Sequence, residues 1–340
     1  MTPRIIRLIA EIDEFKGYWK GMEALSRDTL AVYRHLATIE SIGSSTRIEG
    51  ASLSNSDISS LLKEIDRRSF RTRDEQEVAG YAKALEMVQD QSDVIDLNEN
   101  NIKYLHKALL QLSEKDQWHL GTYKKHPNPV AMFDASGKEI GLIFETASPL
   151  QTPLLMTGLV ERTQRLLLDE NMHPLLVIAD FVVRFLAIHP FQDGNERLSR
   201  VLTNLLLLRS GYEFVKYSSH ERIVEANKDR YYRALRETQR EHLEKEDISP
   251  TWAAFFLEML KGQKDALQMK IEREKKAREL PELSGKILHL AREHGRITVA
   301  FLTKSLGANR NTIKKHLQTL VRQERLVQLG KGRGTYYSPF

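Results

Sequence analysis

Apolar residues recur at the three- and four-residue spacing of amphipathic helices along most of this chain. Residues 1–95 follow this spacing with few glycine or proline interruptions, so we expect them to be helical. Similar stretches follow, and the pattern predicts helices over 97–118, 151–169, 174–188, 195–210, 219–240 and 249–262. The chain is therefore predicted to be mainly α.

One interval departs from the helical pattern. Two short apolar runs, VAMF and IGLIF, flank a turn-type sequence at residues 134–137. This arrangement predicts a β-hairpin over 130–144. The residues alone leave open whether the hairpin has a function or is merely structural.

Residues 281–340 have a pattern of their own. An amphipathic helix is followed by a helix, a turn and a second helix, and then by two short strands around a glycine-rich basic turn. This order resembles a winged helix-turn-helix, with a recognition helix over about 309–323. Such domains bind duplex DNA or other proteins. The candidates for DNA contact are Arg310, Asn311, Lys314, Lys315, Lys331 and Arg333.

Charge is distributed unevenly along the chain. The 340 residues carry a net charge of +5, but residues 281–340 alone hold 11 Lys and Arg against 3 Asp and Glu. A basic domain beside a mildly acidic body favours an anionic partner for that domain alone. We divide the chain into a helical region (1–95), a core (96–262), a charged helical linker (263–280) and the C-terminal domain (281–340).

Composition excludes several classes of chemistry. The chain has no cysteine, which rules out disulfides, thiolate metal sites and cysteine nucleophiles. The first residues lack the apolar segment of a signal peptide, and no apolar run reaches the roughly 20 residues of a membrane span. We therefore expect a cytoplasmic protein without membrane contact. A homodimer is possible.

The segment HPFQDGNERLSR, residues 189–200, lies between two apolar helices and concentrates polar chemistry there. His189 has a suitable pKa to accept a proton near neutral pH. Asp193 offers the carboxylate that Mg2+ prefers, and Asn195 can donate its amide to a phosphate or cap a helix. Gly194 lets the backbone approach a phosphate closely.

The same segment opens a helix, whose N-terminus favours an anion. Arg197 and Arg200 are three residues apart on this helix, so they share a face. Guanidinium groups bind phosphate bidentately and keep their charge. Together these residues point to transfer of a nucleotide phosphoryl group.

Residues 189–200 resemble the pattern HPFx(D/E)GNGRxxR of the Fic family. The resemblance implies a helical Fic core that transfers AMP from ATP to a Ser, Thr or Tyr hydroxyl of a target protein. It implies that His189 is the general base, that Asp193 holds Mg2+, and that Arg197 and Arg200 bind the β- and γ-phosphates. It also makes the hairpin a flap that aligns the target by strand addition.

The resemblance places Tyr231 and Tyr232 against the adenine, although aromatic pairs on helices are usually core residues. A second family pattern, (S/T)xxxE(G/N), matches Ser45, Glu49 and Gly50. In the family this segment inhibits the enzyme, and the resemblance implies that Glu49 pairs with Arg200. ATP would then bind in an unproductive pose.

Glu196 departs from the family pattern, which has glycine at this position. A carboxylate about 4 Å from a phosphate charge costs roughly 4 kcal/mol at an effective dielectric constant near 20. A side chain that points outward costs far less, and the sequence does not decide between these orientations. The alternative function is therefore a DNA-binding regulator whose Fic core senses nucleotide with weak or no catalysis.

Overall fold

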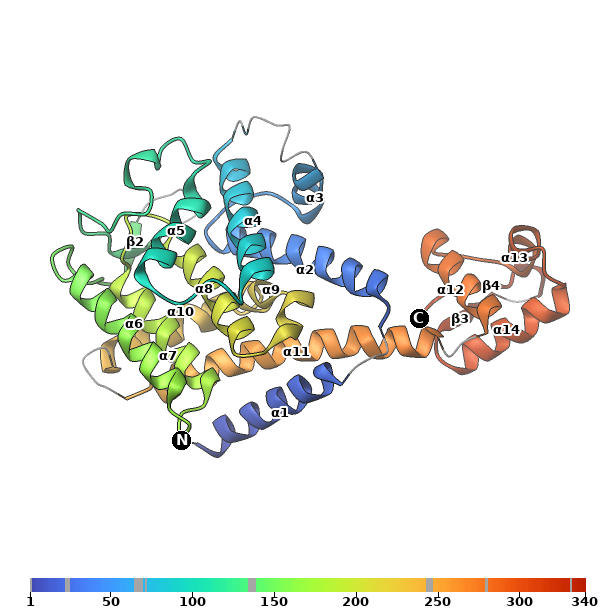
Figure 1. The fold of residues 1–340 in the computed structure, drawn as a ribbon. Coiled ribbons are helices and arrows are strands. Elements are labelled where there is room, and N and C mark those ends of the chain that lie inside the picture. The colour runs from blue at the N-terminus through green and yellow to red at the C-terminus, as the bar shows by residue number, and fades with distance from the viewer. Residues whose placement is uncertain are drawn as a thin grey trace. The chain divides into compact units, whose positions relative to one another are not determined.

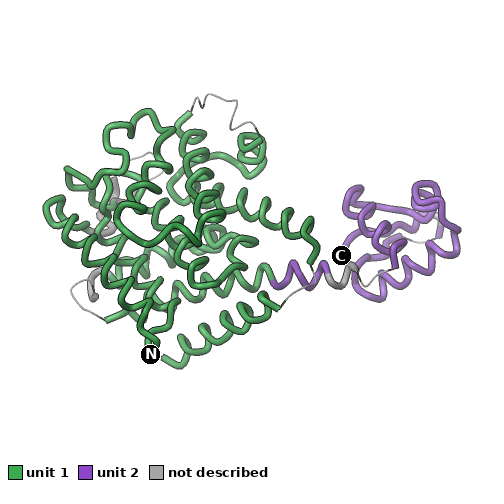
Figure 2. Tube along the Cα trace, in the orientation of Figure 1, with its two compact units in different colours: residues 1–267 green, residues 268–340 purple. Residues whose placement is uncertain are grey.

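The computed structural model describes residues 2–340, apart from 22–24, 64–69, 71, 134–138, 243–246, 279–280 and 331. The described chain is mostly helical, as the sequence predicts (Figure 1). It separates into two compact units, residues 1–267 and 268–340 (Figure 2). Each unit is described by itself below, and the four-part division made from the sequence stays a prediction.

Four helices precede the core of the first unit. They are α1 (Pro3–Lys20), α2 (Arg27–Ile48), α3 (Asn55–Lys63) and α4 (Arg73–Gln91). Polar caps set where three of them begin: Thr2, Ser26 and Thr72 each accept a hydrogen bond from a backbone N–H of the first turn. Thr72 and Glu75 form a complete capping box at α4.

The core consists of α5 (Glu99–Leu110), α6 (Thr152–Leu168), α7 (Pro174–Ile188) and α8 (Asn195–Arg209). Helix α7 packs between α6 and α8, and α8 also contacts α4 and α5. Almost every residue of α7 and α8 is buried. The loop that joins these two helices, residues 189–194, is therefore held on a rigid base.

Helix α5 ends at Leu110, earlier than the helix predicted over 97–118. The following turn satisfies its own polar groups: Ser113 Oγ donates to Asp116 Oδ2 over 2.5 Å, and Gln117 Nε2 donates to the Ser113 carbonyl over 2.8 Å. Such local side-chain bonds compete with helix continuation. A short 3-10 turn, η1 (Gln117–His119), replaces the last predicted helical residues.

The predicted hairpin is present. Strands β1 (Val130–Phe133) and β2 (Glu139–Phe144) pair antiparallel. The predicted turn, residues 134–137, lies outside the described residues, so only the two flanking strands are described.

The chain then returns to helices. After a 3-10 segment, η2 (Glu213–Tyr217), come α9 (His220–Glu225), α10 (Lys228–His242) and α11 (Pro250–Arg278). Residues 263–278 of the stretch predicted as a charged linker belong to α11, and Gln263, Lys264 and Leu267 at its start are buried. Gln263 is held because its amide donates to the Ser218 carbonyl.

The second unit contains α12 (Glu282–His294), α13 (Val299–Leu306), α14 (Arg310–Arg322), β3 (Leu326–Leu329) and β4 (Tyr336–Pro339). Strands β3 and β4 pair antiparallel, so the order of elements is the one the sequence predicts. Apolar residues from all three helices and both strands form its separate core, including Ile287, Leu302, Ile313, Leu326 and Tyr337.

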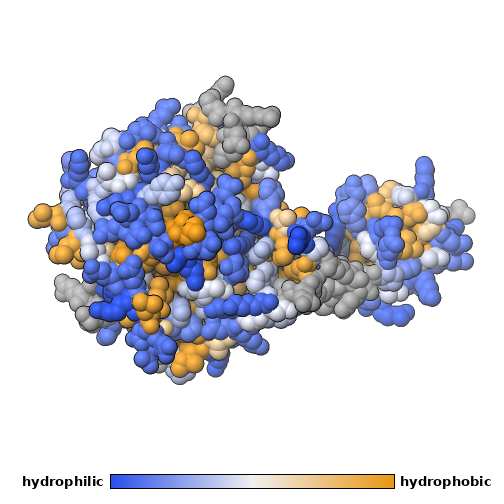
Figure 3. Space-filling view, in the orientation of Figure 1, coloured by the Kyte–Doolittle hydropathy of each residue, from blue (hydrophilic) through white to orange (hydrophobic). Residues whose placement is uncertain are grey.

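No helix among the described residues is both long and apolar enough to span a bilayer. On the face shown in Figure 3, hydrophilic side chains cover most of the first unit and apolar ones form small separate groups.

Candidate active site

His189 lies where α7 ends. Its backbone adopts a left-handed conformation with φ 52°, and its N–H still donates to the Phe185 carbonyl over 2.8 Å. The imidazole Nδ1 lies 3.2 Å from the Leu186 carbonyl. Because a carbonyl only accepts, Nδ1 carries the proton and Nε2 keeps its lone pair. Burial lowers the pKa of His189 to about 4, so the ring is neutral near pH 7. A neutral imidazole with an unprotonated Nε2 can accept a hydroxyl proton.

Asn195 shapes the loop that follows His189. Its Oδ1 accepts the Phe191 N–H over 2.8 Å, and its Nδ2 donates to the Phe191 carbonyl over 2.7 Å. The side chain is 1% exposed. The N-cap of α8 is Gly194, not Asn195. The structure thus gives Asn195 a loop-bracing contact, while its predicted contact with phosphate stays a prediction.

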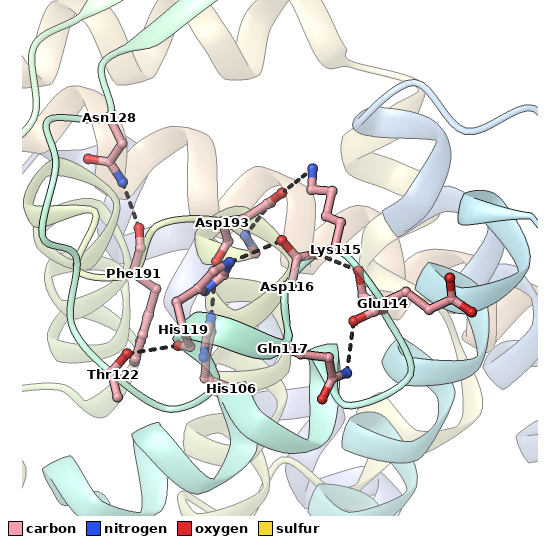
Figure 4. A network of polar contacts seen from close by, with 12 residues as sticks. His106, Glu114, Lys115, Asp116, Gln117, His119, Thr122, Asn128, Phe191 and Asp193 are labelled. Atoms are coloured by element: carbon pink, nitrogen blue, oxygen red, sulfur yellow. Dashed lines mark hydrogen bonds and ion pairs between the residues drawn. The ribbon is translucent and has the colours of Figure 1, made fainter.

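Asp193 and Gly194 form the turn at the start of α8. Gly194 has φ 79°, which suits glycine, and its N–H donates to Asp193 Oδ1 over 2.5 Å. Asp193 Oδ1 also accepts from Arg197, and Oδ2 lies 3.1 Å from Lys115 Nζ (Figure 4). Burial opposes ionisation of Asp193, but the charges of Arg197 and Lys115 outweigh it and lower its pKa to about 2. Asp193 is therefore an anion at neutral pH.

Asp193 is a candidate Mg2+ ligand only in combination with a substrate. No group of three or more His, Cys, Asp or Glu side chains among the described residues is arranged to hold a metal. Mg2+ commonly binds through one or two carboxylates together with water and substrate phosphates. Asp193 is ionised and its side chain is 29% exposed, so it fits that minimal role.

Arg197 and Arg200 are both buried, but they have different partners. Arg197 lies between Glu77 Oε2 and Asp193 Oδ1, at 3.2 Å from each. Arg200 donates to Ser45 Oγ over 2.8 Å, to the Ser45 carbonyl over 3.1 Å and to Glu49 Oε1 over 2.7 Å. The pair predicted between Glu49 and Arg200 is therefore present.

The second motif lies at the end of α2. Glu49 is the C-cap residue, and Gly50 follows with φ 100°, which ends the helix. Two further contacts hold this end in place. Arg47 makes a bidentate pair with Glu225 at 2.8 and 3.0 Å, and Lys228 Nζ donates to the Ile48 carbonyl over 2.7 Å.

Glu196 points inward, towards Glu49, which settles the orientation that the sequence left open. The two side chains share a hydrogen bond. Burial first, and then the charge of Glu49, raise the pKa of Glu196 well above its usual range. Burial also disfavours the Glu49 anion, but Arg200 outweighs it and lowers the pKa of Glu49. A hydrogen bond between two carboxyl groups needs one proton, and these opposite directions place it on Glu196, which donates to the Glu49 carboxylate.

Several site residues carry no signal in the sequence pattern. Lys124 is buried, and its Nζ donates to the Ile188 carbonyl, Asn128 Oδ1 and Thr146 Oγ1 over 2.8 to 3.0 Å. It therefore ties both ends of the hairpin to the residue before His189. Burial lowers the pKa of Lys124 to about 8.

A second group of buried polar residues that the sequence pattern does not reveal is centred on Glu221. The buried Glu221 carboxylate accepts from Tyr81 over 2.9 Å and from Asn204 over 3.1 Å. Tyr81 also bonds to Ser45, so the network links α4, α8 and α9 to the second motif on α2. Each of these residues looks like an ordinary polar position in a helix, and only the packing of helices distant in the sequence brings them together.

The two tyrosines predicted for adenine differ in placement. Tyr231 is buried in an aromatic cluster, with its ring centroid 5.9 Å from that of Trp252. Tyr232 is partly exposed. Burial raises the pKa of both tyrosines, and the nearby carboxylates of Glu196 and Glu49 raise it further. Tyr232 is accordingly the more accessible of the two for contact with a base.

In the second unit, Arg310, Asn311, Lys314 and Lys315 are exposed on α14, whose opposite face buries Ile313, Leu317 and Leu320. Lys331 and the side chain of Arg333 lie outside the described residues.

Comparison with known proteins identifies the family. A sequence profile of the Fic/DOC family matches residues 96–207. A Fido domain-containing protein of Dictyostelium discoideum is 32% identical over 107 residues, which are 32% of this chain and 69% of that relative. The chain belongs to the Fic/DOC family.

Other relatives match over shorter stretches. A protein adenylyltransferase Fic of Drosophila ananassae is 38% identical over 81 residues, which are 23% of this chain and 15% of that relative. The chain thus covers only a small part of the length of that relative.

Solved structures share the fold. A Fic family protein of Desulfovibrio desulfuricans has a TM-score of 0.62 at 20% identity, over 100% of this chain and 97% of its own. A fragment of Fic-1 from C. elegans has a TM-score of 0.58 at 19% identity, over 81% of this chain and 72% of its own.

The shared proton predicts how stability depends on pH. Because the pKa of Glu196 is raised on folding, its contribution to stability is complete below the unfolded-state pKa and is lost as the pH rises through the folded-state pKa. Glu196→Gln keeps a donor for Glu49 but does not titrate. We expect the melting temperature of the wild type to fall relative to that of Glu196→Gln as the pH rises from the unfolded-state pKa of Glu196 through its raised folded-state pKa.

The control is Glu86→Gln, an exposed position on α4, which should follow the wild-type profile. Parallel melting curves for the wild type and Glu196→Gln across this range would contradict the shared proton.

Proposed function

We propose that this protein transfers AMP from ATP to a Ser, Thr or Tyr hydroxyl of a target protein, and that Glu49 restrains the transfer. One observation carries the proposal. The basic His189 Nε2 lies at one end of a short loop, and the other end opens a helix that carries two buried arginines. A proton acceptor is thereby placed beside an anion-binding helix terminus. Relatives named protein adenylyltransferase Fic support the same reaction.

In this reaction the target hydroxyl oxygen attacks the α-phosphorus, and His189 Nε2 accepts the hydroxyl proton. A new bond forms between that oxygen and phosphorus, the bond from phosphorus to the bridging oxygen breaks, and pyrophosphate leaves. Mg2+ bound through Asp193 would neutralise phosphate charge during this step. Arg197 and Arg200 hold the remaining phosphates, and Tyr232 contacts the adenine.

The restraint follows from the contacts of Arg200. Its Nε donates to Ser45 and its Nη2 donates to Ser45 and Glu49, so these groups on α2 occupy one side of the guanidinium fork that would bind a γ-phosphate. Productive binding of ATP requires Glu49 to leave. The neutral Glu196 strengthens the restraint, since it supplies Glu49 with a second hydrogen bond.

Removal of Glu49 tests both the reaction and the restraint. Glu49→Gly frees Arg200, so we expect incorporation of label from α-labelled ATP with Mg2+ to rise by about 10-fold or more over the wild type.

Adding His189→Ala should then lower the transfer by about 100-fold or more while leaving ATP binding nearly intact, because the base acts on the hydroxyl. Equal loss of binding and transfer would instead make His189 structural.

Glu196 should limit the gain from Glu49→Gly. Without Glu49, Arg200 and Arg197 favour the ionised form of Glu196 beside the phosphates. Glu49→Gly combined with Glu196→Gly should therefore exceed the product of the single effects. No transfer by any of these variants would favour the alternative of a nucleotide-sensing regulator.

A second candidate function, DNA binding by residues 281–340, is favoured by the exposed basic face of α14. We expect the full chain to bind duplex DNA weakly, with strong salt dependence. Lys314→Ala with Lys315→Ala should reduce the slope of log affinity against log salt by about 2. The charge-matched control, Lys286→Ala with Arg292→Ala on α12, should change it less. No binding even at low salt would make this unit a protein-contact domain.

A further inference from the structure

His106 lies beneath the loop of residues 189–194 and outside both sequence motifs (Figure 4). It belongs to α5 and is fully buried. Its Nδ1 accepts the Gly121 N–H over 3.0 Å, and its Nε2 lies 3.0 Å from the Asp193 carbonyl oxygen. A backbone N–H only donates, so Nδ1 is unprotonated and Nε2 carries the hydrogen. The two backbone groups together select a single neutral tautomer, which donates to Asp193.

The ring of His106 is also held from one face. It stacks on Phe191 with a centroid separation of 3.8 Å and an interplanar angle of 9°. The backbone of Phe191 is in turn fixed by Asn195 and by Asn128, whose Nδ2 donates to the Phe191 carbonyl over 2.6 Å. His106 is therefore a rigid support for the loop.

The bond to the Asp193 carbonyl determines where the next N–H points. In a trans peptide, the carbonyl of Asp193 and the N–H of Gly194 face opposite directions. With the carbonyl held down on His106, the Gly194 N–H faces the Asp193 carboxylate, 2.5 Å away, on the side of the loop where α8 begins. Glycine tolerates both orientations of the adjoining peptide, so Gly194 itself does not prevent a flip. A flipped peptide would present a carbonyl oxygen to an incoming phosphate.

We propose that His106 is a positioning residue that locks the 193–194 peptide, so that the Gly194 N–H, here bonded to Asp193 Oδ1, and not a carbonyl oxygen lies on the side of the loop where the nucleotide phosphates bind. This rests on the proposed function, since it assigns the phosphate-binding end of that site. His106 does not touch the substrate. It acts through the orientation of one peptide group, and it needs its neutral, Nε2-protonated form to do so.

Two conservative variants separate the two hydrogen bonds of His106. In His106→Gln the side-chain nitrogen takes roughly the place of Nε2 and keeps a donor for the Asp193 carbonyl. In His106→Asn the side-chain oxygen takes roughly the place of Nδ1, so the bond from Gly121 is kept and the bond to Asp193 is lost. Each variant removes the ring stacking, which makes them matched controls for stability.

The variants are made in the full chain carrying Glu49→Gly, and ATP affinity is measured by calorimetry. We expect His106→Asn to weaken ATP binding by about 10-fold and His106→Gln to stay within about 2-fold of the parent. Hydrogen exchange over residues 191–197 provides a second readout that needs no nucleotide. It should accelerate in His106→Asn and remain near the parental rate in His106→Gln.

A merely structural His106 would lower affinity and protection equally in both variants, in step with their melting temperatures, and that result would overturn the inference. Failure of the proposed function looks different. The Glu49→Gly parent would then transfer no label from α-labelled ATP, whether or not it binds ATP, while hydrogen exchange would still separate the two variants. Equal exchange in both variants would overturn the inference whatever the parent binds.

Discussion

Arg200 imposes the constraint on which the rest of the site depends. Its guanidinium is buried and always charged, and an unpaired charge of this kind costs several kcal/mol in a protein interior. Burial disfavours the cation, but the Glu49 carboxylate outweighs burial and raises the pKa of Arg200. An anion must therefore accompany Arg200 in every state of the protein. Glu49 supplies it here. Under the proposed function a nucleotide phosphate replaces Glu49 at Arg200, so the two anions exclude each other.

The end of α2 is built to hold Glu49 at Arg200. The two residues before Glu49 are held in place, because the Arg47 side chain pairs with Glu225 and Lys228 donates to the Ile48 carbonyl. Glu196 carries a proton and donates it in a hydrogen bond to the Glu49 carboxylate. The two carboxyl groups therefore lie together beside Arg200 with one negative charge between them. Under the proposed function, the departure of this residue from the family pattern strengthens the restraint by Glu49, and it opposes phosphate only when Glu49 has gone.

Most of the fold and the outline of the site could be predicted from the sequence, because helical periodicity and the two motifs are local signals. It predicted the hairpin and the C-terminal order of elements, and its resemblance to the Fic family implied the pairing of Glu49 with Arg200. It did not predict the orientation of Glu196, the early end of α5, or the roles of His106, Lys124 and the Tyr81–Glu221 network. These depend on which buried polar groups meet when α2, α4, α5 and α8 pack, and spacing along one helix contains no information about partners on another.

The relative affinity for ATP and ADP tests the exclusion of phosphate by Glu49 most directly. Calorimetric titration of the wild type and of Glu49→Gly with each nucleotide isolates the γ-phosphate, which is the group that needs Arg200. The account predicts similar affinities for ATP and ADP in the wild type, and a preference for ATP of about 10-fold or more in Glu49→Gly, as expected for charge-assisted bonds. A wild type that already prefers ATP to the same degree would contradict it.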